Sequence, residues 1–227
     1  TVEFVPAVNL TETRVTASPG NINADGTSTA TAKVEFKDYE GNAVSVDPAK
    51  VVILLNGAVV AATAKGNGVF EATVPARTVA ETVKVNAKYD AIQVASSASV
   101  TFVPVVDPAA TVVSANPAQV NADGVSTARA TVTFKDYAGQ AINVAAADVE
   151  LLLSGAVVTA TIVSDGVFEA TVPARTTAEE VEVTAKYKGT EAASKATVTF
   201  VPALNLASTT ITAGPATVNA DGTSTAT

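Results

Sequence analysis

Short segments in which apolar and polar residues alternate follow one another along the whole chain. In residues 28–37, for example, Ala30, Ala32, Val34 and Phe36 alternate with polar or charged residues. Because successive side chains of a strand point to opposite faces of a sheet, this pattern predicts a strand with one buried face. Gly, Pro, Asn and Asp mark turns between the segments, and none shows the period of an amphipathic helix.

Seven such strands are predicted in the first part of the chain, at residues 10–17, 28–37, 51–55, 58–64, 68–74, 82–89 and 97–103. The turn signals between them are specific. Asp25-Gly26 supplies the positive φ of a tight reversal, and Asn56-Gly57 is a strong signal for a two-residue hairpin. Short strands without helices predict an all-β fold, an immunoglobulin-like Greek-key sandwich of two sheets.

The sequence also repeats itself with a period of 98 residues. The motifs that return at this spacing are Phe-Val-Pro at Phe4, Phe102 and Phe200, Asn-Ala-Asp-Gly at Asn23, Asn121 and Asn219, and Val-Phe-Glu-Ala-Thr-Val-Pro-Ala-Arg at Val69 and Val167. About 57 of the 98 aligned positions are identical between residues 7–104 and 105–202. Similarity of this degree indicates a recent tandem duplication.

The repeat predicts the domain organisation. Residues 1–6 match the last strand of a preceding repeat, 7–104 and 105–202 are complete repeats, and 203–227 match the start of a third, incomplete one. We therefore expect tandem sandwiches in an extended array that continues in both directions. Residues 103–108 join the complete repeats with two prolines and no glycine, which favours a stiff joint.

Comparison of the repeats predicts which face of each strand is buried. Val52 becomes Glu150, whereas Val51, Ile53 and Leu55 stay apolar in the second repeat, so Val52 is expected to face water. The same alternation predicts an inward face for Phe70, Ala72, Val74, Val83, Val85, Ala87, Tyr89, Ala98, Val100 and Phe102.

The composition narrows the function further. Aromatic residues make up 5% of the 227, so the core is expected to consist mainly of small β-branched side chains. Cys, His, Met and Trp are absent, which removes the thiolate nucleophile, the commonest general base and the commonest metal ligand. No glycine-rich phosphate loop occurs either. We expect no catalytic, cofactor-binding or metal-ligating residue in this chain, and no enzyme.

Charge and hydropathy exclude two partners. The net charge of −8 disfavours binding to the phosphates of a nucleic acid. No apolar run approaches the roughly 18 residues that a membrane-spanning helix needs, so we expect no membrane insertion in this segment.

Three groups of residues are candidate sites. Asp25, Asp123 and Asp221 lie in Asp-Gly turns, where an Asx turn is favoured over a calcium ligand because the acids are dispersed. For a Lys–Asn isopeptide crosslink, the recurring residues are Lys37, Lys88 and Arg77, but both lysines are predicted to point outward. Tyr39 and Tyr137 are lone turn tyrosines, for which packing over a hairpin end is favoured over a sugar-binding platform.

Residues 23–42 combine Ala-Asp-Gly, an alternating strand and a turn that ends in Gly-Asn. This stretch resembles the bacterial immunoglobulin-like domains of the invasin/intimin type (group 1), although Gln140 replaces Asn42 in the second repeat. Residues 165–172 and 196–200 resemble later strands of the same family. The resemblance covers nearly the whole chain and implies tandem rigid stalks on bacterial surfaces. It brings no catalytic residues.

The expected function is therefore structural: an extracellular stalk, fibre or surface layer on a bacterial cell, whose partners include other copies of the same protein. The alternative is an adhesion module whose repeats bind a host receptor, a glycan or neighbouring copies directly. A third hypothesis is that a terminal strand of one chain completes the partial repeat of another by strand addition.

Overall fold

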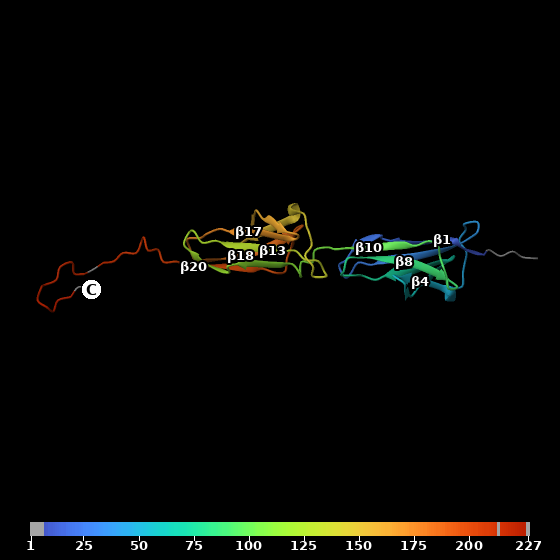
Figure 1. Ribbon diagram of the computed structural model, residues 1–227, viewed down its shortest axis with the longest axis horizontal. Coiled ribbons are helices and arrows are strands. Elements are labelled where there is room, and N and C mark those ends of the chain that lie inside the picture. Colours follow the sequence, from blue (N-terminus) through green and yellow to red (C-terminus); the bar gives the residue numbers. More distant parts are fainter. Residues whose placement is uncertain (1–6, 213, 226–227) are drawn as a thin grey trace, which may run out of the picture.

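The computed structural model describes residues 7–212 and 214–225. Two β-sandwiches of similar construction follow each other along the long axis of the molecule (Figure 1). The strands of the first are β1 (Val8–Ser18), β2 (Asn21–Asn23), β3 (Ala30–Asp38), β4 (Val51–Leu55), β5 (Ala58–Val60), β6 (Thr63–Gly66), β7 (Val69–Val74), β8 (Glu81–Tyr89), β9 (Ile92–Gln93) and β10 (Ala98–Val103), with a 3-10 turn η1 (Pro48–Lys50).

The second sandwich repeats this series. Its strands are β11 (Val112–Asn116), β12 (Gln119–Ala122), β13 (Ala128–Thr133), β14 (Val149–Leu153), β15 (Ala156–Val158), β16 (Thr161–Ser164), β17 (Val167–Val172), β18 (Glu179–Tyr187), β19 (Thr190–Glu191) and β20 (Ala196–Pro202), with η2 (Ala146–Asp148). The first strand is shorter here, because β1 has 11 residues and β11 has five.

Each sandwich consists of two sheets with the same strand order. In the first, one sheet has the order β1-β3-β7-β6 and the other β2-β10-β8-β4-β5, with β9 paired to β8. The corresponding orders in the second are β11-β13-β17-β16 and β12-β20-β18-β14-β15. Neighbouring strands are antiparallel except β2 with β10 and β12 with β20, which run parallel. The predicted all-β class, with tandem immunoglobulin-like sandwiches, is confirmed.

The core of each sandwich lies between its sheets and matches the predicted faces. Ala30, Ala32, Val34 and Phe36 on β3 are 3% exposed or less. The predicted inward residues of β7 and β8 are likewise buried, apart from Tyr89, which is partly buried against the same cluster. Two hydrophobic clusters result, and each contains buried residues of one repeat alone. Each repeat therefore has the core of a self-contained domain.

The predicted strand at 58–64 is wrong in one respect. It is two strands in different sheets: β5 pairs with β4, and β6 pairs with β7. The break falls at Ala61 and Ala62, where the chain crosses from one sheet to the other. The very short β2 and β9 were not predicted, because two or three residues are too few to show alternation.

The outer face of β4 is more covered than predicted. Val52 is only partly exposed, and Leu54 on the same face is 8% exposed although it lies outside the main core cluster. A strand in the middle of a sheet gains this cover from its neighbours, here β5 and β8.

The terminal segments differ from the complete repeats. The predicted strand at 1–6 lies outside the described residues. Within the described parts of 203–227 no strand forms, and Leu204, Leu206 and Ile211 are at least 75% exposed. Among the described residues, no helix is long and apolar enough to cross a membrane.

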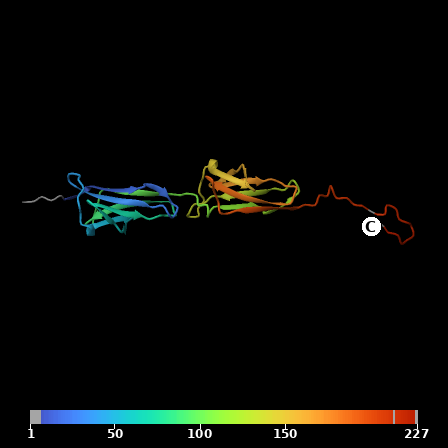
Figure 2. The same cartoon turned by 180° about the vertical axis from the view of Figure 1, so that it is seen from behind.

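The joint between the sandwiches is short. Val103 ends β10, and its carbonyl accepts a hydrogen bond from the Ala24 N–H at 2.8 Å. Val106 already forms a β-bridge with Asp136 in the second sandwich. Pro104 and Val105 alone separate these two anchored points, and the two sandwiches lie end to end on either side of them (Figure 2).

Candidate functional site

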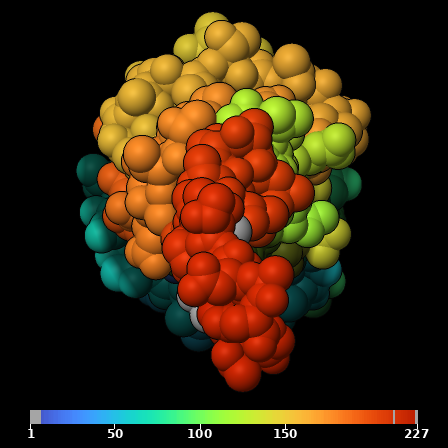
Figure 3. Space-filling model, turned by 90° about the vertical axis from the view of Figure 1, so that its left-hand side faces the viewer, coloured from blue at the N-terminus to red at the C-terminus, as the bar shows by residue number. Residues whose placement is uncertain are grey.

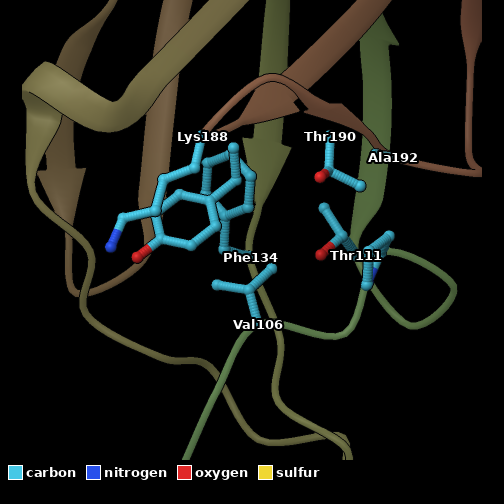
Figure 4. A pocket seen from close by; sticks show the side chains of 8 residues that line it. Val106, Thr111, Phe134, Lys188, Thr190 and Ala192 are labelled. Atoms are coloured by element: carbon cyan, nitrogen blue, oxygen red, sulfur yellow. The ribbon is translucent and has the colours of Figure 1, made fainter.

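A mainly apolar hollow lies in the second sandwich, at the end where the chain enters from the joint (Figure 4). It has a volume of about 230 Å³. The lining comes from the segment that enters the second sandwich, from the residue directly after β13, and from β18, β19 and the residues beside them. The residues are Val106, Pro108, Thr111, Phe134, Tyr187, Lys188, Thr190 and Ala192.

The hollow arises where the second repeat has lost aliphatic volume. Pro108 stands where the first repeat has Leu10, and Ala192 stands where it has Val94. Leu10 packs against the first core, and Val94 is 1% exposed within it. Smaller side chains at both places leave a space beside the Phe134 ring.

Two polar side chains of the hollow, Thr111 and Lys188, have partners within the chain. The buried Thr111 hydroxyl donates to the Asp107 carbonyl at 2.9 Å. The Lys188 ammonium lies 5.3 Å from the centre of the Tyr187 ring and 3.7 Å from the Asp148 carboxylate. The Tyr187 hydroxyl and then Asp148 raise the pKa of Lys188. The arrangement can contact an apolar group at its base and offers one cation at its rim, but no paired nucleophile and base.

The ion pair at this rim is reversed between the repeats. Lys50 and Asp90 lie 3.1 Å apart in the first, and Asp148 and Lys188 take the same two positions with opposite charges in the second. The pairing of opposite charges is retained although the two residues are exchanged. The pair therefore links the start of β4 or β14 to the end of β8 or β18, and neither position needs a particular residue. Both pairs are exposed and contribute little stability.

Filling the hollow should stabilise the second repeat. Ala192→Val restores the residue of the first repeat, and we expect it to raise the free energy of unfolding by roughly 1 kcal/mol. Urea unfolding of the whole chain measures this change. The matched control is Ala185→Val, at a fully buried position where both repeats have alanine, which should destabilise by overpacking. Equal effects of the two variants would contradict the assignment of the hollow.

The Asp-Gly turns have the Asx geometry that the sequence favoured. One carboxylate oxygen of Asp25 accepts from the Thr27 and Ser28 N–H groups at 2.8 and 2.6 Å, and the other accepts from the Ser28 hydroxyl at 2.7 Å. Asp123 and Asp221 have equivalent bonds. Among residues 7–212 and 214–225, no group of three acidic side chains is placed to hold a metal ion. The carboxylates are therefore used within their own turns.

These bonds lower the pKa of each aspartate. The Ser126 N–H, the Ser126 hydroxyl and the Val125 N–H together lower the pKa of Asp123 to about 2. Donors from Ser28 and Thr27 hold the pKa of Asp25 still further below its ordinary range, and those from Ser224 and Thr223 do the same for Asp221.

The turn should therefore stabilise the fold in a pH-dependent way. Because the pKa of Asp123 is depressed in the folded chain, its contribution is present above about pH 4 and is lost as the pH falls through about 2. We expect Asp123→Ala to lower the free energy of unfolding at pH 7 and to have a much smaller effect at pH 2. Urea titrations at both pH values test this, and an equal effect at both would show that the ionised carboxylate is not the cause.

The lysine and tyrosine candidates lie at or near the surface. Lys37 reaches Glu35 at 3.0 Å on the surface, and Lys88 is partly exposed, so neither is a buried crosslinking lysine. Tyr39 is 75% exposed and Tyr137 38%, so the expected packing over the hairpin end is absent for Tyr39. The aromatic contacts lie in the core instead, where Phe36 meets Phe70 edge-on.

Arg77 has a role that the sequence did not reveal. Its guanidinium lies over the Phe102 ring, 5.9 Å from the centre, and is held by Glu81 at 2.6 Å. Its carbonyl accepts from the Gly26 N–H at 2.9 Å. Arg175 repeats these contacts with Phe200, Glu179 and Gly124. In the sequence, the only signal was that an arginine recurs at this position in both repeats, and this did not identify the aromatic ring or the glutamate that it contacts.

Comparison with known proteins agrees with this architecture. The family model described as Invasin, domain 3 matches residues 9–105 and again residues 107–203. No curated protein sequence matches the chain.

Two solved structures show the same fold. The Escherichia coli adhesin FdeC is 24% identical with a TM-score of 0.55, and the match covers 88% of this chain and 67% of that one. Invasin, a bacterial integrin-binding protein, is 19% identical with a TM-score of 0.59, and the match covers 87% of this chain but 41% of that one. Since the family model covers both repeats nearly end to end, this chain belongs to the invasin domain 3 family.

Proposed function

We propose that this chain is part of the repeat region of a bacterial surface adhesin and forms a stiff, extended stalk outside the cell, with domain boundaries at residues 104/105 and 202/203. Membership of the invasin domain 3 family supports the surface setting. The two separate cores support independent units that add length, because each repeat buries its own apolar residues.

The short joint is the observation on which the stalk depends most. Pro104 and Val105 are the only residues between the last hydrogen bond of β10 and the first β-bridge of the next sandwich. Proline fixes one of the few torsions that remain. Bending between repeats is therefore restricted by the chain itself, and no large interface is needed.

Spin labels can measure this restriction, because the chain has no native cysteine. Thr82→Cys and Glu180→Cys together place one label in each repeat, at equivalent exposed positions near the start of β8 and of β18. We expect double electron–electron resonance to give a single narrow distribution of the distance between the two labels. Insertion of Gly-Gly between Pro104 and Val105 should broaden it strongly. A distribution that is already broad without the insertion would rule out a stiff stalk.

The second candidate function is direct adhesion, and the hollow of the second repeat is the observation that favours it. The solved relatives include an adhesin and an integrin-binding protein, which makes integrin a suitable probe. Saturable binding of residues 1–227 to immobilised integrin, lost in Ala192→Val, would support adhesion by this segment. We propose no enzymatic role, since the chain has neither His nor Cys and the hollow lacks a nucleophile–base pair.

A further inference from the structure

The second strand and the last strand of each repeat are paired directly. Strand β2 runs parallel to β10, with Asn21, Ile22 and Asn23 opposite Thr101, Phe102 and Val103. The Thr101 N–H donates to the Gly20 carbonyl and the Ala24 N–H donates to the Val103 carbonyl, both at 2.8 Å. We call β2, Ala24 and β10 the terminal clamp of the first repeat.

The parallel direction determines how this clamp meets tension. A pull on the entering chain acts first on β1, which is paired with β3, and through β1 draws β2 toward the start of the repeat. A pull on the leaving chain draws β10 toward the end of the repeat. The two strands then slide past each other along their axes. Because the inter-strand hydrogen bonds run across the strands, all of them are loaded together. An antiparallel hairpin pulled at its open end would instead lose its bonds one after another.

A motif that occurs three times in the sequence closes the clamp. In Asn23-Ala24-Asp25-Gly26, Ala24 bonds to the end of β10, Asp25 folds the turn, and Gly26 bonds to the Arg77 carbonyl. Arg77 in turn covers the ring of Phe102, the middle residue of the clamp in β10.

The second repeat contains the same assembly. Strands β12 and β20 pair in parallel over four residues, from Gln119 opposite Thr199 to Ala122 opposite Pro202. The Thr199 N–H donates to the Ala118 carbonyl at 2.8 Å, and Arg175 lies over Phe200. The leaving strand of the first clamp continues through Pro104 and Val105 into the second repeat, so tension passes from one clamp to the next.

We propose that the terminal clamps are the force-bearing elements of this chain, and that the Asn-Ala-Asp-Gly motif serves to close them against tension along the array. The inference rests on the proposed stalk, because only a tether experiences such tension. It assigns a mechanical role to a motif whose turn chemistry alone does not explain its bonds to two other segments.

Single-molecule stretching at constant force tests the proposal on the whole chain, held by its two ends. Ala24→Pro removes the N–H that donates to Val103, and we expect the first repeat to unfold roughly ten-fold faster at a fixed force. The control is Val94→Ala, which weakens the same core away from the clamp. It should lower the thermal stability of the first repeat but change the unfolding rate under force little. Ala122→Pro should transfer the effect to the second repeat.

A change of pulling geometry tests the same point without weakening the fold. A handle at Ala58→Cys, an exposed position on β5, lets force enter the first repeat there and leave through β10, so neither β1 nor β2 is pulled. The second repeat is still pulled by its ends and serves as the reference. We expect the first repeat to unfold clearly faster than the second.

Equal rates for the two repeats in this geometry, or equal effects of Ala24→Pro and Val94→Ala, would overturn the clamp. If Ala24→Pro does not fold, the handle experiment decides alone. The spin-label distances are measured without force and report on the joint alone. A narrow distance distribution with no effect of Ala24→Pro would leave the stiff stalk intact and remove the clamp. A broad distribution would remove the stalk, whatever the stretching experiment shows.

Discussion

Gly68→Ala is expected to destabilise the first sandwich by roughly 3 kcal/mol or more, which for a marginally stable domain approaches unfolding. Gly68 has φ +70°, a conformation that side chains with a Cβ rarely adopt. An added Cβ would also lie 2.0 Å from the Val44 carbonyl oxygen, which is backbone and cannot turn aside. The same backbone joins β3, since the Gly68 carbonyl accepts from the Phe36 N–H at 3.0 Å.

A matched glycine separates the clash from the backbone strain. Gly57 has φ +86° in the β4–β5 hairpin, but nothing lies within 4 Å of its Cβ position. Gly57→Ala should therefore cost only the strain, about 1 kcal/mol. Both variants are compared by urea unfolding. Should Gly68→Ala prove no worse than Gly57→Ala, the close approach to Val44 would be wrong.

Phe36→Ala is the second substitution with a large expected effect, a loss of roughly 3–5 kcal/mol. Phe36 is fully buried, and its ring lies 5.9 Å from that of Phe70 and 5.4 Å from that of Tyr89. The loss should be confined to the first repeat, because the two buried clusters share no residue.

Two-dimensional NMR can follow both repeats in one sample. For Phe36→Ala we expect the amide signals of residues 112–202 to remain at native positions under conditions where those of 8–103 have collapsed. Phe134→Ala, at the equivalent position, should give the reverse pattern. Simultaneous loss of both sets of signals in either variant would show that the repeats fold as one unit.

Alternation predicted the long strands well because burial on one face dictates their residue types. Residues 30–36 on β3 and 70–74 on β7 have their predicted faces. The sheet change at Ala61 and Ala62 could not be predicted, since two alanines fit a strand or a crossover equally well. The three-residue β2 was missed for a different reason. Its place is set by hydrogen bonds to β10, nearly eighty residues later in the chain, and not by a local pattern.

The sites were predictable to a smaller extent. The Asx turns followed from Asp-Gly and a following serine, because that chemistry is local. The position of Arg77 over Phe102 depends on two segments that meet only in the fold. In the sequence, the hollow at Ala192 corresponds only to the replacement of Val94 by alanine in the second repeat. That this replacement leaves a space could be inferred only once the structure had placed Pro108 beside Ala192.

The view along the long axis shows the C-terminal segment in front of the second sandwich, which in turn covers much of the first (Figure 3). Small-angle X-ray scattering of residues 7–202 tests this extended arrangement most directly. Two sandwiches of about 36 Å each, from strands of up to 11 residues, give a rod near 80 Å and a radius of gyration of roughly 24 Å. A compact single body of this length would have about 16 Å. A value near 24 Å with a two-lobed distance distribution is predicted, and a value near 16 Å would contradict the account.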